Sequence, residues 1–441
     1  METIINAKID DSDNLYKIIF NKKIISVIKQ NNLIENLDLK DIDLKGSILI
    51  PGAIDPHLHF NDPGFTDNED FFTGTKAALF GGVTTIIDMP CTSLPPVTNV
   101  KNFNNKLSIV KDKALVDFAF WGGVNGAEEL DLEKLKKLKK RGAKAFKIYT
   151  ISGMESYKSL SYKKIGQLFK LTKDEDFIFA FHAEDLDTIE KNRKKISKEE
   201  LKTIDGYLKI RDIDAEVIAI KNIINIAKKY DTKIHIVHLS SKKGLELIKN
   251  YKNCTTETAP HYLHFNSNDL YHLKGRLKTA PVVKNREDQL SLIEGIVNGD
   301  IDFIATDHAG TIFEKNKQFD DFSKVYNGIP GVETMLPSTF DLYNRGIISL
   351  KRLIEITSTN AAKLYNLYPN KGSLEIGTDA DFTIMKKESY IFDESMMQSK
   401  GKYSPFNNMK FNYKVDKTIL RGKIIFNNGK FLGKKGYGNI L

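Results

Sequence analysis

The feature of this 441-residue sequence that most restricts its fold is a long alternation of short apolar runs with amphipathic segments. The runs have the length of strands, and stretches such as residues 212–229 and 286–297 have the apolar spacing of helices. Strands that alternate with helices in this way predict a (β/α)8 (TIM) barrel, whose functional residues gather at the carboxyl ends of its strands. The eight expected strands are residues 47–54, 83–88, 115–121, 143–149, 177–182, 233–238, 253–258 and 302–307.

Both ends of the chain are rich in β-forming residues and carry turn signals. Residues 16–29 hold two such runs joined at Asn21-Lys22, and the pair Asn428-Gly429 divides a similar run near the carboxyl end. We therefore expect an α/β protein in which residues 51–372 form the barrel, while residues 1–50 and 373–441 pair into one small, discontinuous β-sandwich. A doubly wound open sheet is the alternative, but no G-x-G-x-x-G motif follows the first strand.

The first expected barrel strand leads into two histidines separated by one residue. The sequence there is Asp55-Pro56-His57-Leu58-His59. Because side chains alternate along an extended strand, Asp55, His57 and His59 are expected to face the same way. Two imidazoles on one face can bind one metal ion, so this motif predicts a metal site at the mouth of the barrel.

Three further strands end in residues that can bind metal. The same alternation turns His182 inward on the fifth strand, His238 inward on the sixth and Asp307 inward on the eighth, whereas His235 is expected to point away. Four of the nine histidines thus stand at strand ends with an inward phase. Histidine and carboxylate ligands fit Zn²⁺ or a neighbouring first-row metal.

The fourth strand places a lysine inside the barrel. Its inward set is Ala145, Lys147 and Tyr149. An ammonium group beside two cations is strongly disfavoured, but a carboxylated Lys147 would carry negative charge and two oxygens that can bridge metals. A structural lysine that forms a salt bridge is the alternative.

These motifs together resemble those of the cyclic amidohydrolases, which include dihydroorotases, hydantoinases or dihydropyrimidinases, and allantoinases. The matching motifs are D-P-H-L-H at 55–59, A-F-K at 145–147, F-H-A-E at 181–184, I-V-H-L-S-S at 236–241 and A-T-D-H at 305–308, and the similarity extends to residues 375–381. The resemblance implies two bound divalent ions, expected to be Zn²⁺. It implies metal-ligand roles for His57, His59, carboxylated Lys147, His182 and His238, and a combined ligand and catalytic base role for Asp307.

The chemistry that this resemblance implies is hydrolytic opening of a cyclic amide. Two cations about 3.5–4 Å apart can bind a hydroxide and polarise an amide carbonyl. Asp307 would accept the proton of the nucleophile and return it to the departing ring nitrogen. Asp55 would orient a ligand histidine through a hydrogen bond.

Four positions differ together from the motifs of dihydroorotases. Asn61 replaces the arginine that grips the substrate carboxylate in H-x-H-x-R, and Cys91 replaces the asparagine of D-M-P-N-T. Ala280 and Thr311 depart in the same way from K-x-N-P-P and D-H-A-P-H. We expect these four residues to contact the substrate, and their identities argue against dihydroorotate.

Other segments favour allantoin. Residues 59–64, H-F-N-D-P-G, are similar to the H-x-N-E-P-G of allantoinases, and residues 121–123 and 404–406 are also similar to allantoinases. Residues 329–333 are closer to hydantoinases and dihydroorotases. The prediction is therefore hydrolysis of allantoin to allantoate, in purine metabolism, with dihydroorotase and hydantoinase or dihydropyrimidinase as alternatives.

Composition argues against other classes of protein. The net charge of +9 comes from lysines spread along the chain on solvated helix faces, so no nucleic-acid partner is expected. Two cysteines, no visible signal peptide and no apolar run of about 20 residues predict a cytoplasmic protein without a membrane partner. We expect a homodimer or homotetramer. A non-catalytic scaffold paralogue is the remaining alternative, but such proteins generally lose metal ligands and none is missing here.

Overall fold

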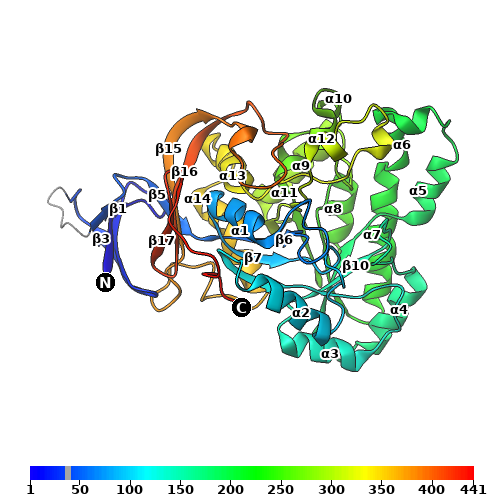
Figure 1. The fold of residues 1–441 in the computed structure, drawn as a ribbon, viewed down its shortest axis with the longest axis horizontal. Coiled ribbons are helices and arrows are strands. Elements are labelled where there is room, and N and C mark those ends of the chain that lie inside the picture. The colour runs from blue at the N-terminus through cyan, green and yellow to red at the C-terminus, as the bar shows by residue number, and fades with distance from the viewer. Residues whose placement is uncertain (35–40) are drawn as a thin grey trace.

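The computed structural model describes residues 1–34 and 41–441. A barrel ringed by helices forms most of the molecule, and a β-sandwich built from both ends of the chain packs against one side of it (Figure 1). The chain ends against the barrel, because Leu441 donates a backbone hydrogen bond to Phe118. The expected combination of a TIM barrel with a sandwich from the two chain ends is confirmed.

The barrel strands are parallel and follow the chain order. One run of paired strands is β6-β7-β8 and the other is β9 to β14. The first and last strands meet where Leu58 pairs with His308, and the third strand joins both runs because Trp121 donates to Asp88 and Gly122 donates to Ala145. The strands are β6 (Ala53–Leu58), β7 (Val83–Asp88), β8 (Asp117–Phe120), β9 (Gly122–Gly123), β10 (Phe146–Tyr149), β11 (Ile178–His182), β12 (Lys233–Ile236), β13 (Cys254–Thr258) and β14 (Phe303–Ile304).

The first strand differs from its prediction. Residues 47–54 were expected to form one barrel strand, but the run is divided between the two parts of the molecule. β5 (Ile48–Pro51) pairs with the sandwich, and β6 begins the barrel. The chain turns at Gly52, where a Cβ atom would lie 2.1 Å from the Oγ1 atom of Thr84. Only glycine lets the two strands separate at this point without displacing Thr84.

The inner cluster of the barrel includes several alanines, whereas phenylalanines of the same strands pack outward. Ala119, Ala145 and Ala180 belong to the inner apolar cluster, whereas Phe179 packs outward in the cluster shared with the helices. No helix in the described part of the chain is long and apolar enough to cross a membrane. The helices are α1 (Phe71–Phe80), α2 (Val100–Val110), α3 (Leu132–Arg141), α4 (Tyr162–Leu171), α5 (Leu186–Arg193), α6 (Ile204–Ile210), α7 (Ile213–Lys228), α8 (Lys242–Ile248), α9 (Pro260–His264), α10 (Asp269–Leu273), α11 (Arg286–Asn298), α12 (Phe313–Asn316), α13 (Met335–Asn344), α14 (Leu350–Ile354) and α15 (Asn360–Leu364).

The sandwich consists of two sheets that enclose their own apolar core. One sheet has the order β3-β2-β1-β4 and the other β18-β17-β16-β15-β5. The predicted hairpins are present, at residues 16–29 and at Asn428-Gly429. The strands are β1 (Glu2–Ala7), β2 (Leu15–Phe20), β3 (Ile24–Gln30), β4 (Asp41–Asp43), β15 (Phe382–Ile391), β16 (Lys410–Leu420), β17 (Lys423–Asn427) and β18 (Lys430–Phe431).

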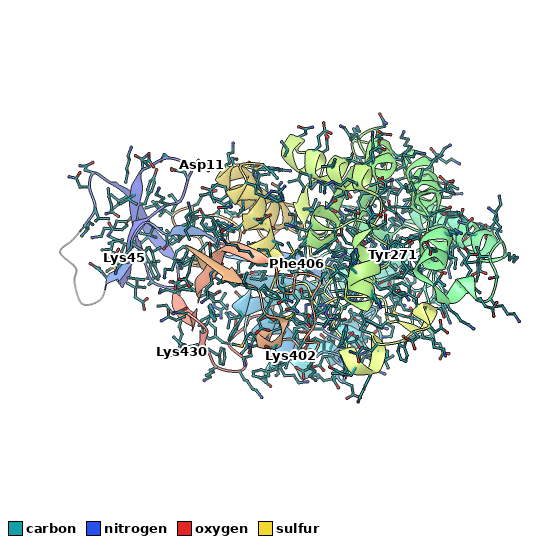
Figure 2. The ribbon with its side chains drawn as sticks, turned by 90° about the horizontal axis from the view of Figure 1, so that it is seen from above. Asp11, Lys45, Tyr271, Lys402, Phe406 and Lys430 are labelled. Carbon is teal, nitrogen blue, oxygen red and sulfur yellow. The ribbon has the colours of Figure 1, made fainter. Side chains whose placement is uncertain are left out.

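Apolar and charged contacts join the sandwich to the barrel. In Figure 2, Lys45 and Lys430 lie on the sandwich side, Tyr271 lies over the barrel, and Phe406 lies between them. The Phe406 ring packs on Phe265 with their centroids 5.0 Å apart. Such contacts hold the barrel and the sandwich together.

Candidate metal centre

Two histidines and an aspartate converge at the carboxyl ends of β6 and β14. The Oδ1 atom of Asp307 lies 3.1 Å from the Nε2 atom of His57 and 3.2 Å from the Nε2 atom of His59. All three ligand atoms lie within 4.8 Å of one another. Burial alone would raise the pKa of Asp307, but the two imidazoles hold it well below its usual value. The group is a buried metal-site candidate.

A second pair of imidazoles lies beside the first group. The Nδ1 atom of His182, at the end of β11, lies 3.0 Å from the Nε2 atom of His238, and the rings of His57 and His238 are 5.4 Å apart. The structure thus brings together the four histidines that the sequence selected.

The side-chain alternation predicted for the sixth strand is wrong. Ile234 and Ile236 pack outward against the helices, whereas His235 is stacked on Phe303 of the inner cluster. His238 reaches the site for a different reason. Its backbone has a φ of 41°, which ends the strand and turns the side chain back inward.

Lys147 of β10 lies next to the first group. Its Nζ atom is 3.5 Å from the Nε2 atom of His57 and 5.2 Å from the centre of the Tyr149 ring. The side chain is fully buried, and burial lowers its pKa to about 8. Within the described residues no carboxylate oxygen lies within 4 Å of this ammonium, so the salt bridge considered as an alternative is absent there.

Two buried glutamates hold the outer nitrogens of the histidines. Glu257 contacts the Nδ1 atom of His57 through one oxygen and the Nε2 atom of His235, at 3.2 Å, through the other. Glu184 contacts the Nε2 atom of His182 at 2.8 Å. Sequence reasoning missed both roles, although Glu184 is part of the F-H-A-E motif. Glu257 has no histidine beside it in the sequence and could be found only from the fold.

Asp55 was expected to orient a ligand histidine, but it does not contact a histidine ring. Its oxygens accept from the backbone N–H of Thr306 at 3.1 Å, from the Thr306 hydroxyl and from the backbone N–H of His57 at 3.3 Å. The cause is a register irregularity between Asp55 and Leu58, which changes the alternation inside the motif. Burial raises the pKa of Asp55 to about 6. Asp55 therefore joins β6 to the chain after β14, while Glu257 holds the ring.

A cavity of about 380 Å³ opens beside these groups. Its lining combines metal-site candidates with residues 151–154 and residues 325–328. Arg211 also lines the cavity, which the sequence did not predict. The lining includes His59, Thr92, Tyr149, His182, Arg211, His238, Ala280 and Asp307.

Of the four residues expected to contact the substrate, Ala280 lines this cavity. Cys91 lies behind the wall, with its sulfur 3.2 Å from the hydroxyl oxygen of Tyr149 and 3.7 Å from the Nδ1 atom of His59. Thr311 is buried and donates to the Oδ1 atom of Asn68 at 2.8 Å. Asn61 is 2% exposed, with a φ of 58°, and is also outside the lining. Sequence neighbours of these three residues, namely His59, Thr92 and Ala309, do line the cavity. The direction of the Asn61, Cys91 and Thr311 side chains could not be predicted from the motifs.

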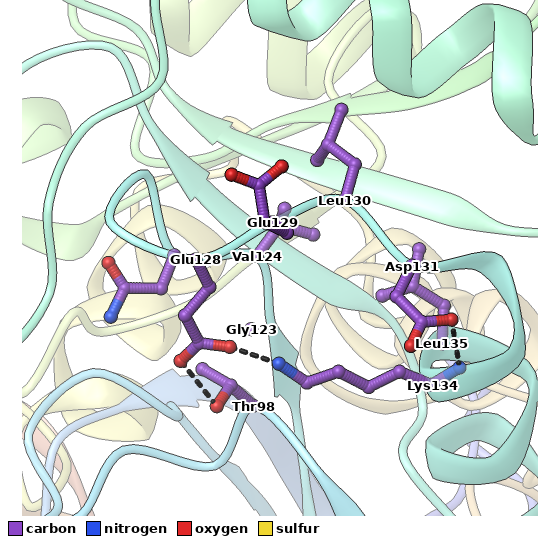
Figure 3. Close-up of a pocket in the computed structure, with 10 residues that line it drawn as sticks. Thr98, Gly123, Val124, Glu128, Glu129, Leu130, Asp131, Lys134 and Leu135 are labelled. Atoms are coloured by element: carbon purple, nitrogen blue, oxygen red, sulfur yellow. Dashed lines mark hydrogen bonds and ion pairs between the residues drawn. The ribbon is translucent and has the colours of Figure 1, made fainter.

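A smaller hollow lies between residues 123–131 and the start of α3, with Thr98 in its lining. Figure 3 shows Glu128 between Thr98 and Lys134. The Thr98 hydroxyl donates to this carboxylate at 2.8 Å, and Lys134 forms an ion pair with it. Because Glu128 is already paired and no imidazole lines the hollow, it is not a competing metal centre.

Comparisons with known proteins agree with this geometry. The chain matches the amidohydrolase family over residues 48–425. It is 32% identical to an allantoinase from Streptomyces avermitilis over 399 residues, 89% of this chain and 88% of the relative. It is 36% identical to a dihydroorotase from Methanosphaera stadtmanae over 431 residues, 95% of each. The structure of an L-hydantoinase from Arthrobacter aurescens is similar, with a TM-score of 0.92 and 28% identity over 99% of this chain and 98% of that one.

Relatives named for three different substrates thus resemble the chain to a similar degree, while all three are enzymes that act on cyclic amides. The buried group of His57, His59 and Asp307 is the metal-site candidate that such an enzyme requires. The chain therefore belongs to the amidohydrolase family, in its cyclic amidohydrolase group.

Proposed function

We propose that this protein opens the ring of allantoin to give allantoate, with two divalent metal ions as cofactors. The observation that carries the proposal is a buried cluster of four imidazoles, one carboxylate and one lysine, of which His59, His182, His238 and Asp307 line a single cavity. Rings of this size fit a cavity of about 380 Å³ with room for ordered water. A homodimer or homotetramer is the proposed assembly, which light scattering would test.

The donor set fits two divalent ions. The facing nitrogens of His182 and His238 are separate from the oxygen that His57 and His59 share. The Nδ1 atom of His238 is buried without a hydrogen-bond partner in the described part of the chain. Imidazole and carboxylate donors favour Zn²⁺. The proposed ligands are His57, His59 and Asp307 for one ion and His182 and His238 for the other, with Lys147 shared by both.

Lys147 is proposed to be carboxylated. As a free ammonium it is a buried charge without a carboxylate within 4 Å in the described residues, beside an imidazole nitrogen at 3.5 Å. Carbon dioxide adds to the neutral amine, an N–C bond forms and one proton is released. The product is an anion with two oxygens, which removes the unpaired positive charge and adds ligands where cations are expected.

Asp307 is proposed to move the proton of the reaction. When bound, the two ions polarise the amide carbonyl and lower the pKa of water. Asp307 lines the cavity and is held by two imidazoles, so its carboxylate faces the reacting atoms. It accepts a proton from the attacking water, and it gives that proton to the ring nitrogen as the C–N bond breaks.

The charge balance of the cavity favours a neutral ring. Arg211 is a cation on the cavity wall, and the fully buried Glu184, which also contacts His182, forms an ion pair with it. Residues 325–328 contribute Tyr326 and Asn327 to the lining, which are polar and uncharged. A substrate carboxylate would therefore be desolvated without an unpaired cation, whereas a ureido group needs only neutral hydrogen-bond partners.

Dihydroorotate is the second candidate, because Arg211 does line the cavity and a relative at 36% identity is a dihydroorotase. Parallel assays on allantoin, dihydroorotate, hydantoin and dihydrouracil separate the candidates. The proposal requires allantoin to give the highest kcat/KM, with metal present in the purified protein. A higher kcat/KM for one of the other three rings would make that ring the substrate in place of allantoin. If the protein hydrolyses none of the four, the proposed enzymatic function is wrong.

A further inference from the structure

A row of three groups extends from the second imidazole pair to the far side of the cavity wall. The Nε2 atom of His182 lies 2.8 Å from the Oε2 atom of Glu184, and the same oxygen accepts from the Nη1 atom of Arg211. Glu184 is fully buried, and the Arg211 side chain is 16% exposed. A single carboxylate oxygen thus joins a cation to an imidazole.

The backbone at the end of β11 supports the same arrangement. The hydroxyl of Thr150 lies 2.8 Å from the carbonyl oxygens of both His182 and Glu184. This contact fixes the main chain on either side of Ala183, so His182 and Glu184 keep their relative positions. The Arg211 guanidinium lies 5.8 Å from the centre of the Tyr207 ring. Each end of the row is therefore held independently.

The other buried carboxylate of the centre is held differently. Glu257 lies between the imidazoles of His57 and His235, and it also accepts from the backbone N–H of His238 at 3.4 Å. No arginine or lysine forms an ion pair with Glu257 among the residues that the structure describes. The rings of His57 and His182 thus have different supporting carboxylates, and of these two it is Glu184 that pairs with a permanent cation.

We propose that Arg211 is a positioning residue for the metal ion held by His182 and His238, and that it acts through Glu184. This inference rests on the proposed two-metal function and adds an asymmetry to it. The guanidinium holds the Glu184 carboxylate in place, and Glu184 in turn accepts a hydrogen bond from the Nε2 atom of His182. The Nδ1 atom, which faces His238 at 3.0 Å, is then the one left free to bind metal.

The consequence is that loss of Arg211 affects one ion and not the other. Losing a partner of a ligand histidine typically weakens metal binding by about 10–100-fold. In Arg211→Met, Zn²⁺ binding at the His182 and His238 pair should weaken by this factor. Binding at His57, His59 and Asp307 should be unchanged, because Glu257 supports that group from β13.

The experiment is Zn²⁺ titration of the full-length protein after removal and return of the metal, with the bound equivalents read by elemental analysis. The wild type should bind two equivalents, and Arg211→Met should bind one tightly and one about 10–100-fold more weakly. Glu184→Gln should weaken the same ion by a similar factor. The double variant should bind Zn²⁺ no more weakly than either single variant, because both changes interrupt the same chain of contacts from Arg211 to His182. The control is Arg276→Met, which removes an arginine paired with Glu394 outside the cavity and should retain two ions.

Several results would overturn the inference. Two tight ions in Arg211→Met, equal weakening of both ions, or additive losses in the double variant would each contradict it. A raised KM for dihydroorotate with both ions retained would make Arg211 a substrate contact instead. If Arg211→Met does not fold, as judged by its thermal transition, Glu184→Gln alone decides the outcome. A wild type that binds no Zn²⁺ would overturn the proposed function, which keeps the two failures distinguishable.

Discussion

The Nδ1 atom of His182 faces the Nε2 atom of His238 across 3.0 Å, although the two residues are 56 positions apart in the chain. Two imidazole nitrogens at this distance either share one proton or bind a common cation. Because four imidazoles and a carboxylate surround the same space, a shared cation is the interpretation that accounts for all of them.

The first prediction follows from that arrangement. The purified protein should contain close to two equivalents of divalent metal, and His57→Ala or His238→Ala should lose metal and activity together. Elemental analysis and an activity assay on the same preparation check this. A matched control is His272→Ala, on the helix α10 and away from the cavity, which should keep both ions. Full activity in a metal-free preparation would contradict the two-metal centre.

The second prediction concerns Lys147. Lys147→Ala should be nearly inactive, and short carboxylic acids that enter the space left by the side chain should restore part of the rate. Lys144→Ala, two residues before β10, is the control and should remain active. Mass spectrometry under native conditions, or a crystal structure, would detect the added carboxylate. A free amine at Lys147 with both metals bound would refute carboxylation.

The third prediction concerns the proton carried by Asp307. Asp307→Asn keeps the shape of the side chain and removes its capacity to accept a proton. Because general acid–base catalysis contributes about 10²–10⁴-fold, kcat should fall by at least this range while the thermal transition is retained. A decrease of less than about tenfold would assign the proton to another group.

The barrel and the histidines of its candidate metal centre could be predicted because they depend on local patterns. Alternation along the fifth strand correctly turned His182 inward. The same rule failed for His235 and Asp55, because the φ of 41° at His238 and the irregular register before Leu58 interrupt the alternation. Glu257 was not predictable, since its partner His57 is 200 residues away and only the closed barrel brings them together.

The fourth prediction is a pH dependence of stability that arises outside the metal centre. Burial raises the pKa of Glu333 to about 8, and the negative charge of Glu69 adds to the effect. Since the folded pKa exceeds the unfolded value, the protonated form stabilises the protein below about pH 4.5, and this contribution is lost as the pH rises through about 8. Glu333→Gln keeps an acceptor for the backbone N–H of Gln398, 2.8 Å away. The variant should have a flatter Tm between pH 5 and pH 8.5, and an unchanged pH profile of Tm would contradict the shift.

The last prediction concerns the substrate. Wild-type kcat/KM for allantoin should exceed that for dihydroorotate by at least about 10²-fold, because a buried unpaired carboxylate costs several kcal/mol and each 1.4 kcal/mol is a factor of ten.

Asn61→Arg is not the variant that tests this preference, since Asn61 is buried with a φ of 58° and an arginine there should destabilise the fold. Met154 lines the cavity and is half-buried, so Met154→Arg adds a cation on the wall. This variant should narrow the ratio by about tenfold or more, through improved dihydroorotate hydrolysis, whereas Met154→Gln of similar size should not. If the wild type prefers dihydroorotate, the allantoin assignment is wrong.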